Sequence, residues 1–206
     1  PETMAAPGRS KLGLHVQRNN SPNIMEFVRR VKPRVMKGVD DLGFLTEVKQ
    51  VSPQTVTLGR LSDATQPMEG DPVQAAHDFV NRYIERYRSF PGVDYWEGLN
   101  EPVVNGQMAW FAAFEAERVR YMDELGLKCA IGNFSTGIPE YNEFSDFLPA
   151  IRAAQAHGGI LALHEYDAPT LYRSVGAALP GLSPVADRGA LALRYRWWYE
   201  DFIKPN

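Results

Sequence analysis

One short stretch of the chain carries residues suited to acid–base chemistry. It reads Trp96-Glu97-Gly98-Leu99-Asn100-Glu101-Pro102, and it continues the run Val93-Asp94-Tyr95-Trp96, which is rich in aromatic and β-branched residues. Pro91-Gly92 precedes that run, and Pro102, which cannot donate to a strand ladder, follows it. The pattern predicts a strand whose carboxyl end presents Glu101. A carboxylic acid at such a position can act as a general acid in an enzyme.

The rest of the chain repeats a simple order of an apolar run, a polar turn and a helical stretch, which is typical of α/β proteins. We expect six strands, over Lys11–Val16, Arg34–Val39, Thr55–Leu61, Val93–Leu99, Lys128–Gly132 and Ile160–His164. Helical periodicity favours five helices, over Asn23–Val31, Pro72–Tyr87, Gln107–Leu125, Phe144–His157 and Ala190–Ile203. Asp71 suits a helix N-cap, while Gly126 and Gly158 suit helix C-caps.

The number of these units predicts the fold class. Six units in 206 residues average about 34 residues each, and a complete (β/α) eight-stranded barrel has roughly 250 residues. No turn carries the glycine-rich phosphate loop that would favour the rival fold, a doubly wound open sheet. We therefore expect a TIM-type (β/α) barrel with about six of its eight units. Residues 11–206 would form this single domain, after a linker-like segment over residues 1–10.

Polar residues at the ends of the strands are candidates for a shared site, because the carboxyl ends of barrel strands meet at one mouth. Every predicted strand ends in such residues, among them His15, Asp40, Arg60, Asn100, Glu101, Asn133, His164 and Tyr166. Arg60 and His15 could each bind a substrate hydroxyl, hold a catalytic carboxylate or be interior polar groups.

Four carboxylates in or near the strand ends have structural interpretations. Glu97 lies inside its strand and should pair with an interior Arg34, Lys37 or Arg60, because buried charges need partners. Asp40 and Asp41 fit the N-cap and first-turn acid of a following helix. Glu165 lies between His164 and Tyr166, so it should face the helix layer if those two residues face the mouth.

Two of the strand ends resemble motifs of a known enzyme superfamily. Trp96–Pro102 resembles the fourth-strand motif of the clan A glycoside hydrolases, and His164-Glu165-Tyr166 resembles their sixth-strand His-x-Tyr motif. These enzymes share a (β/α) eight-stranded barrel and a retaining mechanism. The resemblance extends from about Leu12 to the last residue. It implies that Glu101 is the general acid/base, that Asn100 donates to the sugar 2-hydroxyl, and that His164 and Tyr166 line the subsite nearest the cleaved bond.

The implied reaction is retaining hydrolysis of a β-linked glycoside or polysaccharide, which needs a second carboxylate as nucleophile. In the clan this is a glutamate at the end of the seventh strand, so we expect it beyond residue 206. We therefore expect the 206 residues to be a fragment that is inactive by itself. The alternative function is a non-catalytic carbohydrate-binding barrel, a degenerate glycosidase. A structural or interaction protein is a third class, which the cluster of polar strand ends disfavours.

Composition limits the partners. A net charge of −3 and a pI near 5.9 argue against nucleic acid as a partner. None of the four histidines lies within ligand spacing of another, which disfavours a metal-dependent hydrolase, and we expect no cofactor. No apolar run approaches the roughly 20 residues that span a bilayer, so we expect a soluble chain. The sequence leaves the compartment open: a secreted or extracellular location is plausible, and a cytoplasmic one is not excluded. The oligomeric state is also left open.

Overall fold

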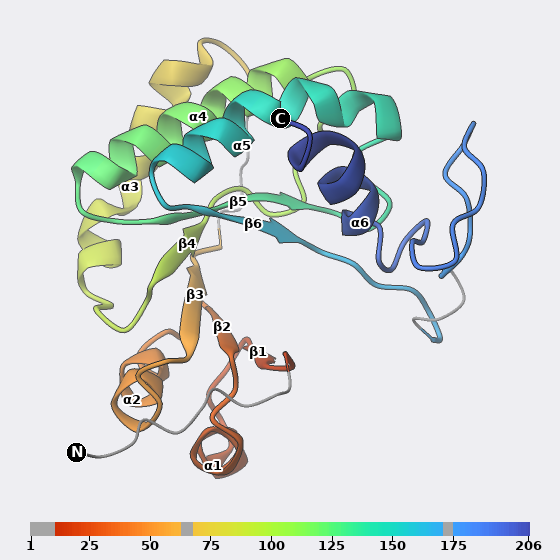
Figure 1. Cartoon of the computed structure of the whole chain (residues 1–206). Helices are drawn as coiled ribbons and strands as arrows, with labels where there is room; N and C mark the ends of the chain where they lie inside the picture. The colour runs from red at the N-terminus through yellow and green to blue at the C-terminus, as the bar shows by residue number, and fades with distance from the viewer. Residues whose placement is uncertain (1–10, 63–67, 171–174) are drawn as a thin grey trace. The chain divides into compact units, whose positions relative to one another are not determined.

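The computed structural model describes residues 11–62, 68–170 and 175–206 (Figure 1). Six parallel strands, in the sheet order β1-β2-β3-β4-β5-β6, alternate with helices along the chain. This is the architecture of an incomplete TIM-type α/β barrel, and it confirms the predicted fold class. The linker-like segment predicted over residues 1–10 lies outside the described residues. No helix in the described ranges combines the length and the apolar character that crossing a membrane requires.

The strands lie where the sequence predicted them, although most are shorter. They are β1 (Leu14–Val16), β2 (Val35–Val39), β3 (Val56–Arg60), β4 (Tyr95–Glu97), β5 (Cys129–Phe134) and β6 (Ile160–Leu163). The helical elements are α1 (Pro22–Val31), α2 (Phe44–Val51), α3 (Pro72–Arg88), α4 (Met108–Glu124), η1 (Tyr141–Phe147), α5 (Leu148–Ala156), α6 (Tyr195–Trp198) and η3 (Tyr199–Ile203).

One helix was missed, and two predicted helices need correction. The helix α2 was not predicted, and its buried face consists of Phe44, Leu45 and Val48. The helix predicted over Phe144–His157 is divided, because its first turns belong to the 3₁₀ helix η1. The helix predicted over Ala190–Ile203 begins only at Tyr195 and ends in a π-helical segment.

The chain divides into two compact units, which we describe separately. The first unit contains the described residues up to 62 together with 81–97, and the second contains those of 65–80 and 98–206. The division falls between Glu97 and Gly98, so the Trp96–Pro102 stretch contributes to both units.

The first unit is built on the parallel strands β1 to β4. Arg60 and Val39 are partners in the register of β2 and β3, and Gly59 lies opposite Trp96 in the register of β3 and β4. Trp96 is buried, and a Cβ added to Gly59 would lie 2.8 Å from its ring. The absence of a side chain at Gly59 therefore allows the indole to pack closely against β3.

The second unit pairs β5 with β6 and covers them with α4, η1 and α5 (Figure 1). Its core is aromatic, with Phe134 packed edge-on against Phe111 and Phe147. The predicted cap of α3 is confirmed, since the Asp71 carboxylate accepts the main-chain N–H of Val73 at 3.1 Å. The predicted C-cap glycines are also confirmed in their left-handed conformation, with φ of 76° at Gly126 and 68° at Gly158.

Candidate active site

Glu101 and His164 meet through their side chains in the second unit. Nδ1 of His164 lies 2.8 Å from Oε1 of Glu101, across 63 residues of sequence. The Glu101 side chain is 33% exposed and that of His164 is 17% exposed. Two residues predicted for the site are therefore in direct contact, with the carboxylate still open to solvent.

The end of β5 fixes the main chain of both residues. The N–H of Glu101 donates to the carbonyl of Asn133 at 3.0 Å, and the N–H of His164 donates to the carbonyl of Phe134, also at 3.0 Å. The ladder between β5 and β6 is irregular at this point, with a register shift between Gly132 and Phe134. The dipeptide Asn133-Phe134 of β5 therefore fixes the main-chain positions of Glu101 and His164.

Two residues of this region have an unusual backbone. Glu101 and Asn133 both have φ of 49°, in the left-handed region. Asparagine enters that region more readily than most residues, whereas glutamate does so at a cost of about 1–2 kcal/mol. Strained residues of this kind occur at functional sites more often than elsewhere.

Asn133 is also a buried polar residue. From the sequence it was predicted only to follow the end of a strand. It is 0% exposed, and neither atom of its side-chain amide has a hydrogen-bond partner among the residues that the structure describes. The same holds for Nε2 of His164. Buried polar atoms are usually hydrogen-bonded to protein or to ordered water, so these three atoms are exceptions within the described residues.

The other two members of the predicted motifs lie beside this pair in the chain. Asn100 is half-buried and directly precedes Glu101. Tyr166 is 50% exposed, and its carbonyl accepts a hydrogen bond from the Thr136 hydroxyl at 2.8 Å. The main chain of Tyr166 is therefore held while its ring remains accessible.

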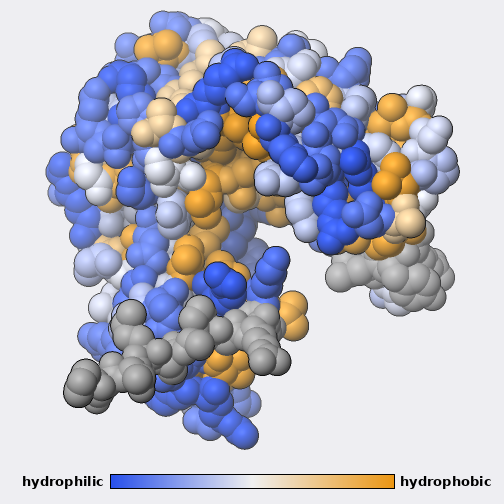
Figure 2. Space-filling model, in the orientation of Figure 1, coloured by the Kyte–Doolittle hydropathy of each residue, from blue (hydrophilic) through white to orange (hydrophobic). Residues whose placement is uncertain are grey.

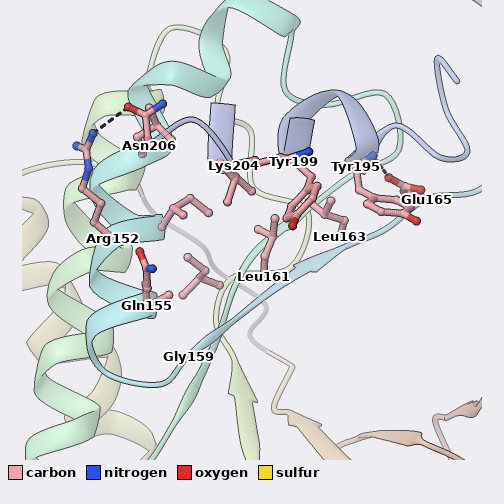
Figure 3. A pocket seen from close by; sticks show the side chains of 15 residues that line it. Arg152, Gln155, Gly159, Leu161, Leu163, Glu165, Tyr195, Tyr199, Lys204 and Asn206 are labelled. Atoms are coloured by element: carbon pink, nitrogen blue, oxygen red, sulfur yellow. Dashed lines mark hydrogen bonds between the residues drawn. The ribbon is translucent and has the colours of Figure 1, made fainter. Parts of the chain in front are cut away.

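Glu165 faces the helix layer, as predicted, because its side chain lines a pocket beside the helices (Figure 3). With Leu161 and Leu163 it lines a pocket of about 840 Å³ between β6, α5 and the C-terminal helical segment. Its carboxylate accepts the main-chain N–H of Tyr195, where α6 begins. Burial raises the pKa of Glu165, and main-chain donors at the start of α6 oppose the shift. In Figure 2, hydrophobic side chains gather near this pocket, beside the hydrophilic C-terminal segment.

In the first unit, Glu97 is 2% exposed and lies between two cations. Its Oε2 is 2.7 Å from Nζ of Lys37 and 3.6 Å from Nη1 of Arg60. The prediction that Glu97 pairs with interior basic residues is confirmed for Lys37 and Arg60, whereas Arg34 is exposed. Arg60, a predicted candidate for substrate binding, is therefore buried in this ion cluster. His15, the other such candidate, is exposed on β1, with Lys37 as its partner in the β1–β2 register.

Asp40 and Asp41 do not cap a helix, so their predicted role was wrong. The N-cap of α2 is Gly43. The Asp40 carboxylate accepts the N–H of Ser62 at 2.8 Å, and that of Asp41 accepts the N–H of Asn19 at 2.7 Å. Both carboxylates therefore tie together loops that follow neighbouring strands.

Comparison of the chain with protein-family models, with curated proteins and with solved structures finds no match.

Proposed function

We propose that this chain provides the acid/base half of a retaining glycoside hydrolase that acts on a β-linked glycoside or polysaccharide, with Glu101 as the general acid/base. The observation that carries the proposal is the 2.8 Å contact between Glu101 and His164. It joins the two segments whose sequences resemble clan A motifs. The Glu101 carboxylate is held by His164, and one third of its side chain is exposed to solvent. Such a group is suited to transfer a proton to a bound substrate.

The chemistry assigns a separate task to each oxygen of Glu101. Oε1 lies 2.8 Å from Nδ1 of His164 and would accept its N–H in the tautomer that is protonated there. Oε2 would then carry the proton to the glycosidic oxygen as the C–O bond breaks. A second carboxylate attacks the anomeric carbon and forms a glycosyl-enzyme. Water then attacks this intermediate and gives its proton to Glu101, which restores the acid.

The remaining residues of the motifs would bind the substrate. Asn100 would donate to the 2-hydroxyl, a contact that strengthens as the sugar ring flattens in the transition state. His164 and the accessible ring of Tyr166 would line the subsite nearest the cleaved bond. The nucleophile carboxylate is taken to come from outside these 206 residues, and the proposed reaction needs no metal and no cofactor.

The test is a leaving-group experiment on the protein as its gene encodes it. Glu101→Gln should lower kcat/KM about 10²–10⁴-fold on a polysaccharide, since a poor leaving group depends on protonation. The loss should be much smaller on an activated aryl glycoside, and NMR of the first-formed sugar should show retention. Glu85→Gln makes the same chemical change on a side chain that is 84% exposed, and it should leave the rate unchanged.

Other results would count against the proposal. An equal loss on both substrates would exclude the acid role of Glu101. Binding of a glycan without hydrolysis of any β-linked substrate would instead support the alternative, a non-catalytic carbohydrate-binding barrel.

A further inference from the structure

An ion pair on α4 is completely enclosed in the second unit. Arg118 donates through Nε to Oε2 of Glu115 at 2.9 Å, and Nη2 lies 2.7 Å from the same oxygen. Both side chains are 0% exposed. Burial raises the pKa of the Glu115 carboxyl, and the adjacent guanidinium opposes the shift.

The pair is bound to β5 immediately before the residues that hold the candidate site. Nη2 of Arg118 donates to the carbonyl of Ala130 at 2.9 Å. The main chain of Gly132 acts on the Glu115 carboxyl as well, because it lowers the pKa of that group. Gly132 directly precedes Asn133 and Phe134, whose carbonyls bind the N–H groups of Glu101 and His164.

The same guanidinium also lies against the segment that leads to Glu101. A Cβ added to Gly98 would be 2.9 Å from Nε of Arg118 and 3.0 Å from its Cζ. The absence of a side chain at Gly98 therefore lets the main chain rest directly on Arg118, three residues before Glu101. One buried pair thus contacts both segments that converge on the site.

Stability is a poor explanation for such a pair. Burial removes the hydration of both charges, which costs free energy. Proteins with apolar side chains of similar volume in place of a buried ion pair are often equally stable or more stable. Apolar side chains cannot, however, form the directional hydrogen bonds that hold the main chain of β5 in place.

We infer that Arg118 and Glu115 are positioning residues, which hold β5 and the Gly98 segment so that Glu101 and His164 meet. The inference deepens the proposed function and rests on it, because positioning matters only if Glu101 takes part in the chemistry. Neither residue touches the reacting atoms.

The double variant Arg118→Met, Glu115→Leu tests the inference in the protein as its gene encodes it. We expect it to fold, with a kcat at least about tenfold lower and a KM changed less than about twofold, because small displacements of reacting groups are costly. The side-chain ¹⁵N signals of His164 should also shift, since they report the hydrogen bond to Glu101 without requiring activity.

A matched control lies on the same helix. Arg120 and Glu117 have the same types and spacing, but the Arg120 side chain is 44% exposed. The double variant Arg120→Met, Glu117→Leu should leave both kcat and the His164 signals unchanged.

The outcomes separate the two proposals. A folded Arg118→Met, Glu115→Leu protein with wild-type kcat and His164 signals would overturn the positioning role and leave the hydrolase intact. Absence of hydrolysis in the wild type would overturn the hydrolase, while the His164 signals would still report the positioning. If the double variant does not fold, Gly98→Ala takes its place, because its methyl group must displace Arg118. Unchanged His164 signals in that variant would overturn the inference.

Discussion

Glu97 and Glu101 are four residues apart in the chain, yet their surroundings are opposite. Glu97 is 2% exposed and lies between Lys37 and Arg60, whereas Glu101 is a third exposed and has a histidine as partner. The first arrangement is that of a structural ion cluster inside a unit, and the second is that of a group that can meet a substrate. The two glutamates therefore have different roles because their surroundings differ.

The largest expected effect concerns stability at Glu97. Glu97→Gln should lower the free energy of unfolding by about 3–5 kcal/mol, because it leaves Lys37 and Arg60 buried without their carboxylate. Urea denaturation followed by circular dichroism measures the change. Glu101→Gln is the control, with an expected loss below about 1 kcal/mol, since its surroundings are partly solvated. Similar losses in the two variants would erase the contrast between the two glutamates.

A second prediction tests how closely the surroundings of Glu97 are packed. Gly59→Ala should cost about 1–3 kcal/mol, because the new methyl group would lie 2.8 Å from the ring of Trp96. Gly43→Ala, in the same unit, meets nothing within 4 Å and should change the stability by less than about 1 kcal/mol. Thermal unfolding of both variants provides the comparison, and equal stability would mean that the Trp96 ring moves aside freely.

A third prediction concerns the backbone beside Glu101. Asn133→Ala and Asn133→Gly remove the same buried amide, but only glycine accepts φ of 49° without cost. The alanine variant should therefore be less stable than the glycine variant by about 1–2 kcal/mol, as measured by urea unfolding. A glycine variant no more stable than the alanine variant would exclude a backbone requirement at this position.

The smallest effect is expected at the N-caps of two helices. Ser21 caps α1 and Asp71 caps α3 through their side-chain oxygens. Replacement of either by alanine should cost about 1 kcal/mol in the free energy of unfolding, and replacement by glycine only a few tenths. A loss several times larger at one cap would mean that its side chain has a further role.

Much of the fold could be predicted, because alternation and caps are local signals. The six strands and the cap at Asp71 follow from apolar runs and from single residue types. The helix α2 was not predicted because it is short and holds Thr46, Val48 and Val51, which are β-branched residues that also suit a strand.

The candidate site was only partly predictable. Glu101 and His164 stand out because their motifs follow strands, but the buried Glu115 and Arg118 cannot be told apart by sequence from Glu117 and Arg120. All four lie on α4, and only tertiary packing decides which pair is enclosed. The bulge at Asn133 depends likewise on the pairing of β5 with β6, which no local pattern encodes.

The alternation of side chains along β6 and its extension should also disfavour misalignment of the strand. Leu163 and Glu165 face the helices, while His164 between them reaches Glu101 on the opposite side. A slip of one residue would bring the carboxylate of Glu165 toward that of Glu101 and would turn His164 into the apolar pocket. Repulsion between like charges and the burial of an imidazole both oppose that misfolded state. We therefore expect the order His-Glu-Tyr to disfavour that slip.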